Sequence, residues 1–425
     1  MSRFQFTLQL AGAFFAGIAT YLVVTTAFSQ DPGEAPSLSD ISPVELAMEE
    51  GESGDVGCTS NGCDCCSSQS CGSRCGSFLG PCDWFGCHRD SYSHHKRGGL
   101  ADKHAPAGLM GGHVHKKGQW MFEYKYMNMY MRGNRMGTTN VSDAAAFDVN
   151  INGSVTNAQA IPTNMTMEMH MLHIMYGWSD EISLYAMPMV TSLTMDHMRD
   201  NPFGTPLGPM PALAGQPFTT HNDGIDDVVF GALWKAYEGC TDELIFNFGF
   251  SVPTGDIDRQ TSAPFGVPID LPYPMRIGSG TFDFRPGVTY RSNYDHGSIG
   301  LQYTADLTLG TNSEGYALGD EHKINAWYSW LVCDRLALSF RVENHWRNNI
   351  DGADVDQNAG TMGFISTNRS DSRGGFWTNL GYGGSLLLGD GYLMNFEAVH
   401  PVYQDLDGIQ LSNDWYFNAG LSKAF

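Results

Sequence analysis

The stretch Arg335–Arg347 reads RLALSFRVENHWR, and its alternation decides the fold class. Leu336 and Leu338 share one parity, whereas Arg341 and Glu343 belong to the other. Successive side chains of a β-strand point to opposite faces, so this period of two predicts a strand with one apolar and one charged face. Such a strand fits two architectures. One is a sheet of a soluble sandwich, and the other is a membrane barrel with lipid outside and water inside.

Similar stretches follow one another from residue 119 onward, and their connections decide between the two architectures. Short turns alternate with long polar loops, as in an outer-membrane barrel, whereas a sandwich has no reason to gather every long loop at one end. The sequence therefore predicts an all-β fold, a transmembrane antiparallel up-and-down β-barrel of about 12 strands. The predicted strands are 119–131, 165–177, 181–195, 226–237, 243–252, 280–292, 297–310, 322–331, 335–347, 375–388, 391–401 and 413–424. The predicted long loops are 132–164, 196–225, 253–279, 311–321, 348–374 and 402–412.

The N-terminal residues 1–29 have the pattern of an export signal peptide. A single Arg3 precedes a long apolar run, and Ala27-Phe28-Ser29 offers a cleavage site. The alternative is an uncleaved anchor helix, because the apolar run is long enough to span a bilayer. Residues 30–57 are acidic and rich in Pro and Gly, which predicts a disordered linker. No later run approaches the ~18 apolar residues of a membrane helix, so a mature membrane form would be a barrel.

The charge and the C-terminus indicate the partners. The chain has 46 Asp and Glu against 24 Lys and Arg, so it lacks the basic footprint of a nucleic-acid-binding protein. Trp415, Phe417 and Leu421 alternate up to the terminal Phe425, which resembles the assembly signal of bacterial outer-membrane barrels. The predicted partners are outer-membrane lipid, the barrel-assembly machinery and a small-molecule solute, with the barrel at 119–425 in the outer membrane.

Four strings resemble a family of outer-membrane proteins that is named for the meta-pathway of phenol degradation. They are Asp223–Asp227, Ser251–Asp256, Ile277–Phe284 with Pro286-Gly287, and Pro401–Gly408. The resemblance covers about 119–425 and is most pronounced from residue 221 onward. It implies a barrel that passes small, often hydrophobic or aromatic, compounds, and it brings no catalytic residues.

Charged residues on the inward parity of the predicted strands are candidates for the lining of a pore. A lumen with both signs of charge would carry a transverse field that sorts polar solutes. The alternative is that these charges pair and fill the barrel. The candidates are Asp283, Arg285, Arg291, Asp306, Lys323, Arg341, Glu343, His345, Arg347 and Glu397. No nucleophile elbow, metalloprotease helix or phosphate loop is present, so the sequence predicts a protein that is not an enzyme.

Residues 58–118 form a predicted periplasmic head and connector rich in Cys and His. With so few apolar residues, the head needs cross-links or metal, and disulfides are the default in an exported chain. The alternative is a zinc or copper site. The disulfide candidates are Cys58, Cys63, Cys65, Cys66, Cys71, Cys75, Cys82, Cys87, Cys240 and Cys333. The candidate metal ligands are Cys63, Cys65, Cys66, Cys71, Cys75, Cys82, Cys87, His88, His113 and His115.

Cys240 and Cys333 fall in predicted short turns, on the side of the barrel that faces the periplasm. They could bridge to each other or to the head. A head tethered in this way would cover or plug that mouth of the barrel.

Methionine is abundant in the first three predicted strands. Thioethers together with imidazoles suit Cu(I), so a copper or silver route is an alternative function. Met as adaptable packing is the other interpretation. Inward-facing Glu168 and His170 would turn the row Met165–Met171 toward lipid, which weakens the metal hypothesis. The sequence thus predicts passive passage of a small solute, with a metal-binding envelope protein or a structural barrel that anchors a head as alternatives.

Overall fold

The computed structural model describes residues 100–151, 154–155, 158, 160–200, 217–239, 241–261, 268–354 and 365–425. The predicted signal peptide, the acidic linker and the cysteine-rich part of the head lie outside these residues. The chain divides into two compact units, Met1–Gly62 and Cys63–Phe425, and every described residue belongs to the second. In the described part, no helix is long and apolar enough to cross a membrane.

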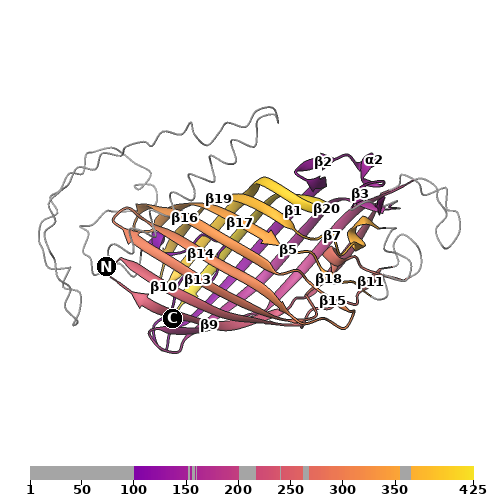
Figure 1. Ribbon diagram of the computed structural model, residues 1–425. Helices are drawn as coiled ribbons and strands as arrows, with labels where there is room; N and C mark the ends of the chain where they lie inside the picture. The colour runs from indigo at the N-terminus through magenta and orange to yellow at the C-terminus, as the bar shows by residue number, and fades with distance from the viewer. Residues whose placement is uncertain are drawn as a thin grey trace, which may run out of the picture. The chain divides into compact units, whose positions relative to one another are not determined.

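Eleven of the described strands form a closed antiparallel ring (Figure 1). Neighbours follow the order β1-β20-β19-β17-β16-β14-β13-β10-β9-β6-β5, and the pairing of β5 with β1 closes the ring. The ring strands are β1 (Trp120–Gly137), β5 (Ala160–Gly177), β6 (Ile182–Met187), β9 (Val228–Glu238), β10 (Asp242–Val252), β13 (Phe282–Tyr294), β14 (Gly297–Leu309), β16 (Glu321–Cys333), β17 (Leu336–Arg347), β19 (Gly375–Gly389) and β20 (Tyr392–Ala424).

The ring contains twelve chain segments because β20 is a hairpin. Residues 392–406 pair with β19, and residues 406–424 pair with β1. The halves meet at Gly408, whose φ of 60° lies in the left-handed region that glycine tolerates. Eleven named strands with one counted twice give twelve, which confirms the predicted barrel of about 12 strands. The long loop predicted at 402–412 is wrong, because strand pairing continues through these residues to the turn.

Two long strands continue the wall at the long-loop end. β7 (Met189–Arg199) follows β6 after Pro188, which has no N–H to give to a ladder, and both strands pair with β5. β8 (Pro217–Ile225) pairs with β7 and precedes β9. The short elements are η3 (Ala101–Lys103), β2 (Thr139–Val141), α2 (Asp143–Ala146), β3 (Asn150–Ile151), β4 (Ser154–Val155), β11 (Gln260–Thr261), β12 (Ile269–Asp270), η5 (Tyr273–Met275), β15 (Tyr316–Ala317), β18 (Asp351–Gly352) and η6 (Ser366–Asn368).

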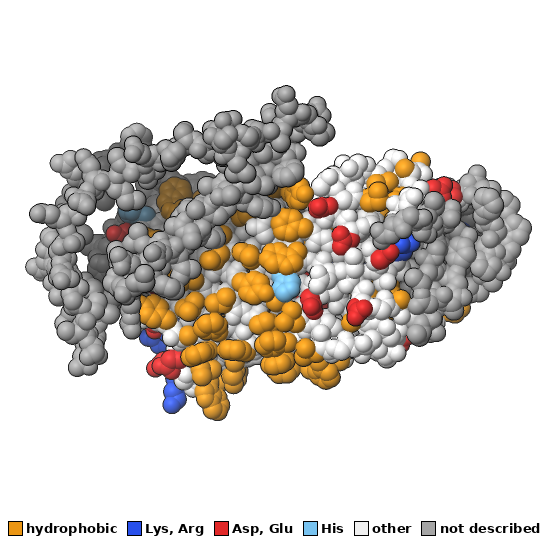
Figure 2. Space-filling model, in the orientation of Figure 1, with side chains coloured by type: hydrophobic (Ala, Val, Ile, Leu, Met, Phe, Trp, Pro, Cys, Tyr) orange, Lys and Arg blue, Asp and Glu red, His pale blue; other side chains and the backbone are white. Residues whose placement is uncertain are grey.

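The outer face of the barrel is apolar over the half of its height that lies next to the short turns. Exposed side chains of this belt include Phe122, Trp234, Phe248, Leu338 and Phe340. Figure 2 shows the belt beside a second half on which polar and acidic side chains prevail. An outward apolar band around a closed sheet is the surface of a transmembrane barrel, so the predicted fold class is confirmed.

Loop residues cover the inner wall at the long-loop end. Leu271, Met275 and Ile277 are buried against Met165 and Met195 of β5 and β7. A second apolar cluster lies among the loops. Its members are Tyr273, Tyr316 and Ile350.

Candidate functional site

A buried charge network surrounds Arg341 on the inner wall. Its guanidinium binds Glu397 with two bonds, Nε to Oε1 at 2.7 Å and Nη2 to Oε2 at 2.9 Å. Nη1 binds Glu343 at 2.6 Å and Asn325 at 2.7 Å, and the Tyr416 hydroxyl donates to Glu343 at 3.0 Å. Arg341 is 1% exposed. A buried ion pair is stable only when hydrogen bonds satisfy its remaining polar atoms, and this network, which joins β16, β17 and both halves of β20, meets that condition.

A second charged cluster centres on Glu321, closer to the long loops. Its carboxylate lies 3.2 Å from Lys323 Nζ, 3.2 Å from His345 Nε2 and 3.6 Å from Arg347 Nη1. The Lys323 side chain is 39% exposed and the Glu321 side chain 27%, although both point into the barrel. The lumen at this height is therefore open to water rather than packed.

The remaining predicted lumen residues are also paired. Arg285 lies 2.6 Å from Asp306, Arg291 pairs with Glu243, and Asp283 accepts hydrogen bonds from two hydroxyl groups. The structure thus places all the charged pore candidates on the inner face, each with a partner. That these residues line a pore remains a prediction.

The segment 100–118 runs inside the barrel, and we name it the plug. Inner-wall side chains bind its backbone carbonyls. Gln302 Nε2 donates to the Met110 carbonyl at 2.8 Å, and Lys125 Nζ donates to the Leu109 carbonyl at 2.8 Å. The connector that was predicted outside the barrel therefore lies partly within it.

The plug fits the Arg341 network at Gly108. The Gly108 N–H donates to Glu397 Oε2 at 2.9 Å. A Cβ at this position would lie 2.5 Å from Glu397 Oε2 and 2.7 Å from Arg341 Nη2, so the close approach requires glycine. Nearer the mouth, the His115 N–H donates to Ser183 Oγ at 2.8 Å. The plug and the charged wall thus form one hydrogen-bonded unit.

Three histidines of the plug lie in a row. The ring centroids of His104 and His113 are 5.9 Å apart, and those of His113 and His115 are 4.9 Å apart. Burial lowers the pKa of His104 and of His115 to about 4, and it lowers the pKa of His113 well below its usual value. These imidazoles are therefore neutral at neutral pH. The other predicted metal ligands, the seven cysteines and His88, lie outside the described residues.

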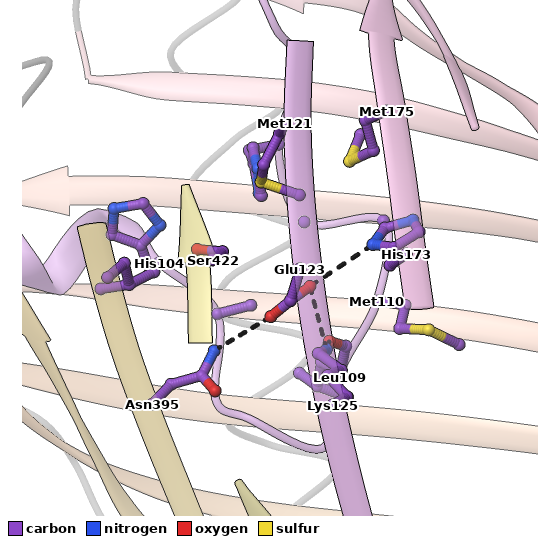
Figure 3. A pocket seen from close by; sticks show the side chains of 15 residues that line it. His104, Leu109, Met110, Met121, Glu123, Lys125, His173, Met175, Asn395 and Ser422 are labelled. Atoms are coloured by element: carbon purple, nitrogen blue, oxygen red, sulfur yellow. Dashed lines mark hydrogen bonds and ion pairs between the residues drawn. The ribbon is translucent and has the colours of Figure 1, made fainter. Parts of the chain in front are cut away.

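A small pocket lies between the plug and the wall of β1, β5 and β20 (Figure 3). Met121 and Met175, directly opposite each other in the strand register, lie side by side at one end. Glu123 occupies the middle, 3.4 Å from His173 Nδ1 on one side and 3.4 Å from Asn395 Nδ2 on the other. Thioethers, imidazoles, one carboxylate and the ammonium group of Lys125, 3.8 Å from Glu123, thus line one cavity.

The methionines of β5 face the lumen. Met169 lies opposite Met127 in the register, on the same parity as the buried Met165 and Met175. His170 belongs to the other parity and is exposed. The sequence left the face of this row open, and Met165–Met171 do not turn toward lipid, because outer-face tyrosines provide the hydrogen bonds that Glu168 and His170 need.

Cys333 is buried at the end of β16, and it is half of a disulfide bond. The other cysteines lie outside the described residues, so the identity of its partner stays a prediction. In the described part of the chain, no three His, Cys, Asp or Glu side chains converge into a ready metal site.

Sequence reasoning expected a head that plugs the mouth, and it missed the connector that lies inside the lumen and the polar neighbours of the charged residues. The plug has no strand period and reads as a Gly- and His-rich connector. Asn325, Asn379 and Tyr416 lie on the inward parity of their strands, and this parity is the signal that could have added them to the lumen set.

No family model matches the chain, and no curated protein matches it. The resemblance to the meta-pathway family therefore stays a prediction. Among solved structures, an outer-membrane channel from Pseudomonas putida F1 is 12% identical with a TM-score of 0.49, and covers 73% of this chain and 97% of its own. A FadL homologue from Pseudomonas aeruginosa is 12% identical with a TM-score of 0.34, covering 72% and 89%. The KdgM porin is 9% identical with a TM-score of 0.32, covering 72% and 99%. Likenesses at this level carry no argument about function.

Proposed function

We propose that the protein is an outer-membrane channel that passes a small solute and is closed by its own plug. The observation that carries the proposal is the plug itself, a backbone segment held by hydrogen bonds inside a barrel with a water-accessible charged lumen.

The short-turn end faces the periplasm in this proposal, because outer-membrane barrels carry short turns on that side and long loops outside. The N-terminal end of the plug also lies there, because the Ala101 N–H donates to the carbonyl of Asp334 in the short β16–β17 turn, so residues 58–99 would lie in the periplasm. A periplasmic head is then placed to pull on the plug or to hold it.

The size of the solute follows from the barrel. Twelve segments give a lumen that is wider than a filled eight-stranded barrel and narrower than a sixteen-stranded porin. The cluster of Glu321, Lys323, His345 and Arg347 has both signs of charge exposed to the lumen, which favours a field that orients small polar solutes.

Single-channel conductance in planar bilayers tests the proposal. The parent protein is compared with a variant that lacks residues 100–116, and Arg285→Met is the control because its ion pair does not bind the plug. We expect the parent and the control to be mostly closed and the deletion variant to conduct steadily. A folded deletion variant that stays silent would refute the channel.

A further inference from the structure

The inner wall of β1, β5, β6 and β7 is built largely of methionine. Four Met pairs face each other across β1 and β5, and two more pairs join β5 to β7. We name this surface the methionine wall. Its members are Met121, Met127, Met129, Met131, Met165, Met167, Met169, Met171, Met175, Met187, Met189 and Met195, twelve of the 21 methionines in the chain.

Packing accounts for only part of this wall. Met used to fill gaps is surrounded by apolar side chains, and that description fits its buried ends, such as Met175 and Met195. Met167 and Met169 in the middle of the wall also pack against apolar clusters. They and their partners Met127 and Met129 are nevertheless only partly buried although they face inward. These thioethers therefore border the lumen, whose other side bears the charged clusters.

The spacing of the wall provides a chain of neighbouring donors. Residues two apart on a strand are about 7 Å apart, and directly opposite residues have Cβ atoms about 5 Å apart. An ion bound by two or three thioethers would thus find the next set within one short step. Thioethers are neutral, soft donors that select Cu(I) and related monovalent ions over magnesium and calcium.

A histidine with an unsatisfied ring nitrogen lies at the plug end of the wall. His115 is 8% exposed, and its Nε2 finds no hydrogen-bond partner in the described residues. A buried nitrogen without a partner is costly unless a ligand satisfies it.

The pocket of Figure 3 completes the plug end of the wall. Glu123 holds Nδ1 of His173, which leaves Nε2 of that ring for a ligand, and a carboxylate behind a histidine commonly orients metal ligands. Met121 and Met175 lie beside it. Because the donors are mainly thioethers, the lack of a three-residue His, Cys, Asp or Glu group in the described part does not conflict with such a site.

We propose that the methionine wall binds soft monovalent metal ions, with Cu(I) as the natural ligand class and Ag(I) as its redox-inert equivalent. Binding to the wall is independent of conduction. The assignment of these ions as the cargo of the channel rests on the proposed function.

Equilibrium dialysis with Ag(I) tests the binding. The full-length protein is used in detergent with its free thiols alkylated, so that the cysteine-rich head does not contribute. The test variant is Met127→Leu/Met129→Leu/Met167→Leu/Met169→Leu, since Met and Leu have similar volumes and the wall stays apolar. The matched control is Met136→Leu/Met394→Leu, two exposed methionines outside the wall. A second variant, His173→Gln, probes the pocket with a single change.

We expect the parent and the control to bind Ag(I) equally, the four-Leu variant to bind at least tenfold more weakly, and His173→Gln to lose part of the affinity. X-ray absorption should show sulfur around the ion in the parent. Equal binding by all four proteins would overturn the proposal. A second measurement separates conduction by the channel from metal binding by the wall. The plug-deleted channel should conduct potassium equally with the native wall and with the four-Leu wall, whether or not the wall binds metal.

Discussion

Replacement of Arg341 by methionine removes the cation of the most buried charge network in the described part of the barrel. Glu397 is 0% exposed and receives two bonds from this guanidinium, so Arg341→Met leaves a buried carboxylate without a cation. Loss of one partner of a buried pair costs about 3–5 kcal/mol. We expect the free energy of unfolding to fall by about that amount. Urea unfolding in lipid vesicles, followed by tryptophan fluorescence, measures it.

Two further variants make the Arg341 result interpretable. Arg285→Met breaks a pair whose side chains are 29% and 31% exposed, so it should cost about 1 kcal/mol or less. Arg341→Met/Glu397→Gln also removes the negative charge of Glu397, so it should recover more than half of the lost free energy of unfolding. A single Arg341→Met variant as stable as the parent, or a double variant as unstable as the single one, would refute the interpretation of this network as one electrostatic unit.

Three other predictions concern the plug, the last strand and the disulfide. Gly108→Val should release the plug, because its Cβ would lie 2.5 Å from Glu397 Oε2, and planar-bilayer recordings should show longer open times; unchanged closure would contradict a fitted plug. Removal of Phe425, which is 65% exposed and whose N–H donates to the Trp120 carbonyl at 2.8 Å, should reduce the folded barrel recovered from outer membranes, as seen by heat-dependent gel mobility; equal recovery would argue against an assembly signal. If Cys240 is the partner of Cys333, Cys240→Ser and Cys333→Ser should cause the same change in non-reducing peptide maps, whereas a disulfide that persists in Cys240→Ser would place the partner in the head.

The period of two predicted the strands well because membrane barrels impose it at almost every position. In Arg335–Arg347, Leu338 and Phe340 are exposed on the outside and Arg341 is buried inside, as the parity requires. The ends of strands were harder to predict, because the wall continues past the apolar belt. The hairpin of β20 shows this, since its turn at Gly408 lies inside a polar stretch that reads as a loop.

The position of the plug inside the lumen and the inward face of β5 could not be predicted in this way. The plug is held through its backbone carbonyls, at Leu109 and Met110 for example. Every residue has a backbone carbonyl, so the sequence does not show which of them bind the wall. On β5 both parities contain polar residues, so the inward face was ambiguous. It is decided by partners on other strands, such as the Tyr126 hydroxyl that donates to Glu168 at 2.6 Å on the outside.

The two sides of the lumen differ in what they can bind, and this difference limits the possible cargo. The charged groups on one side bind each other, as Arg285 and Asp306 do at 2.6 Å. This side can therefore orient a passing molecule, but it has few donors left for a tightly held ligand. The methionine wall has the opposite property, because thioethers make no hydrogen bonds among themselves and keep their lone pairs free. A ligand held in this lumen would therefore contact the methionine wall, while the charged side and the plug determine whether it moves.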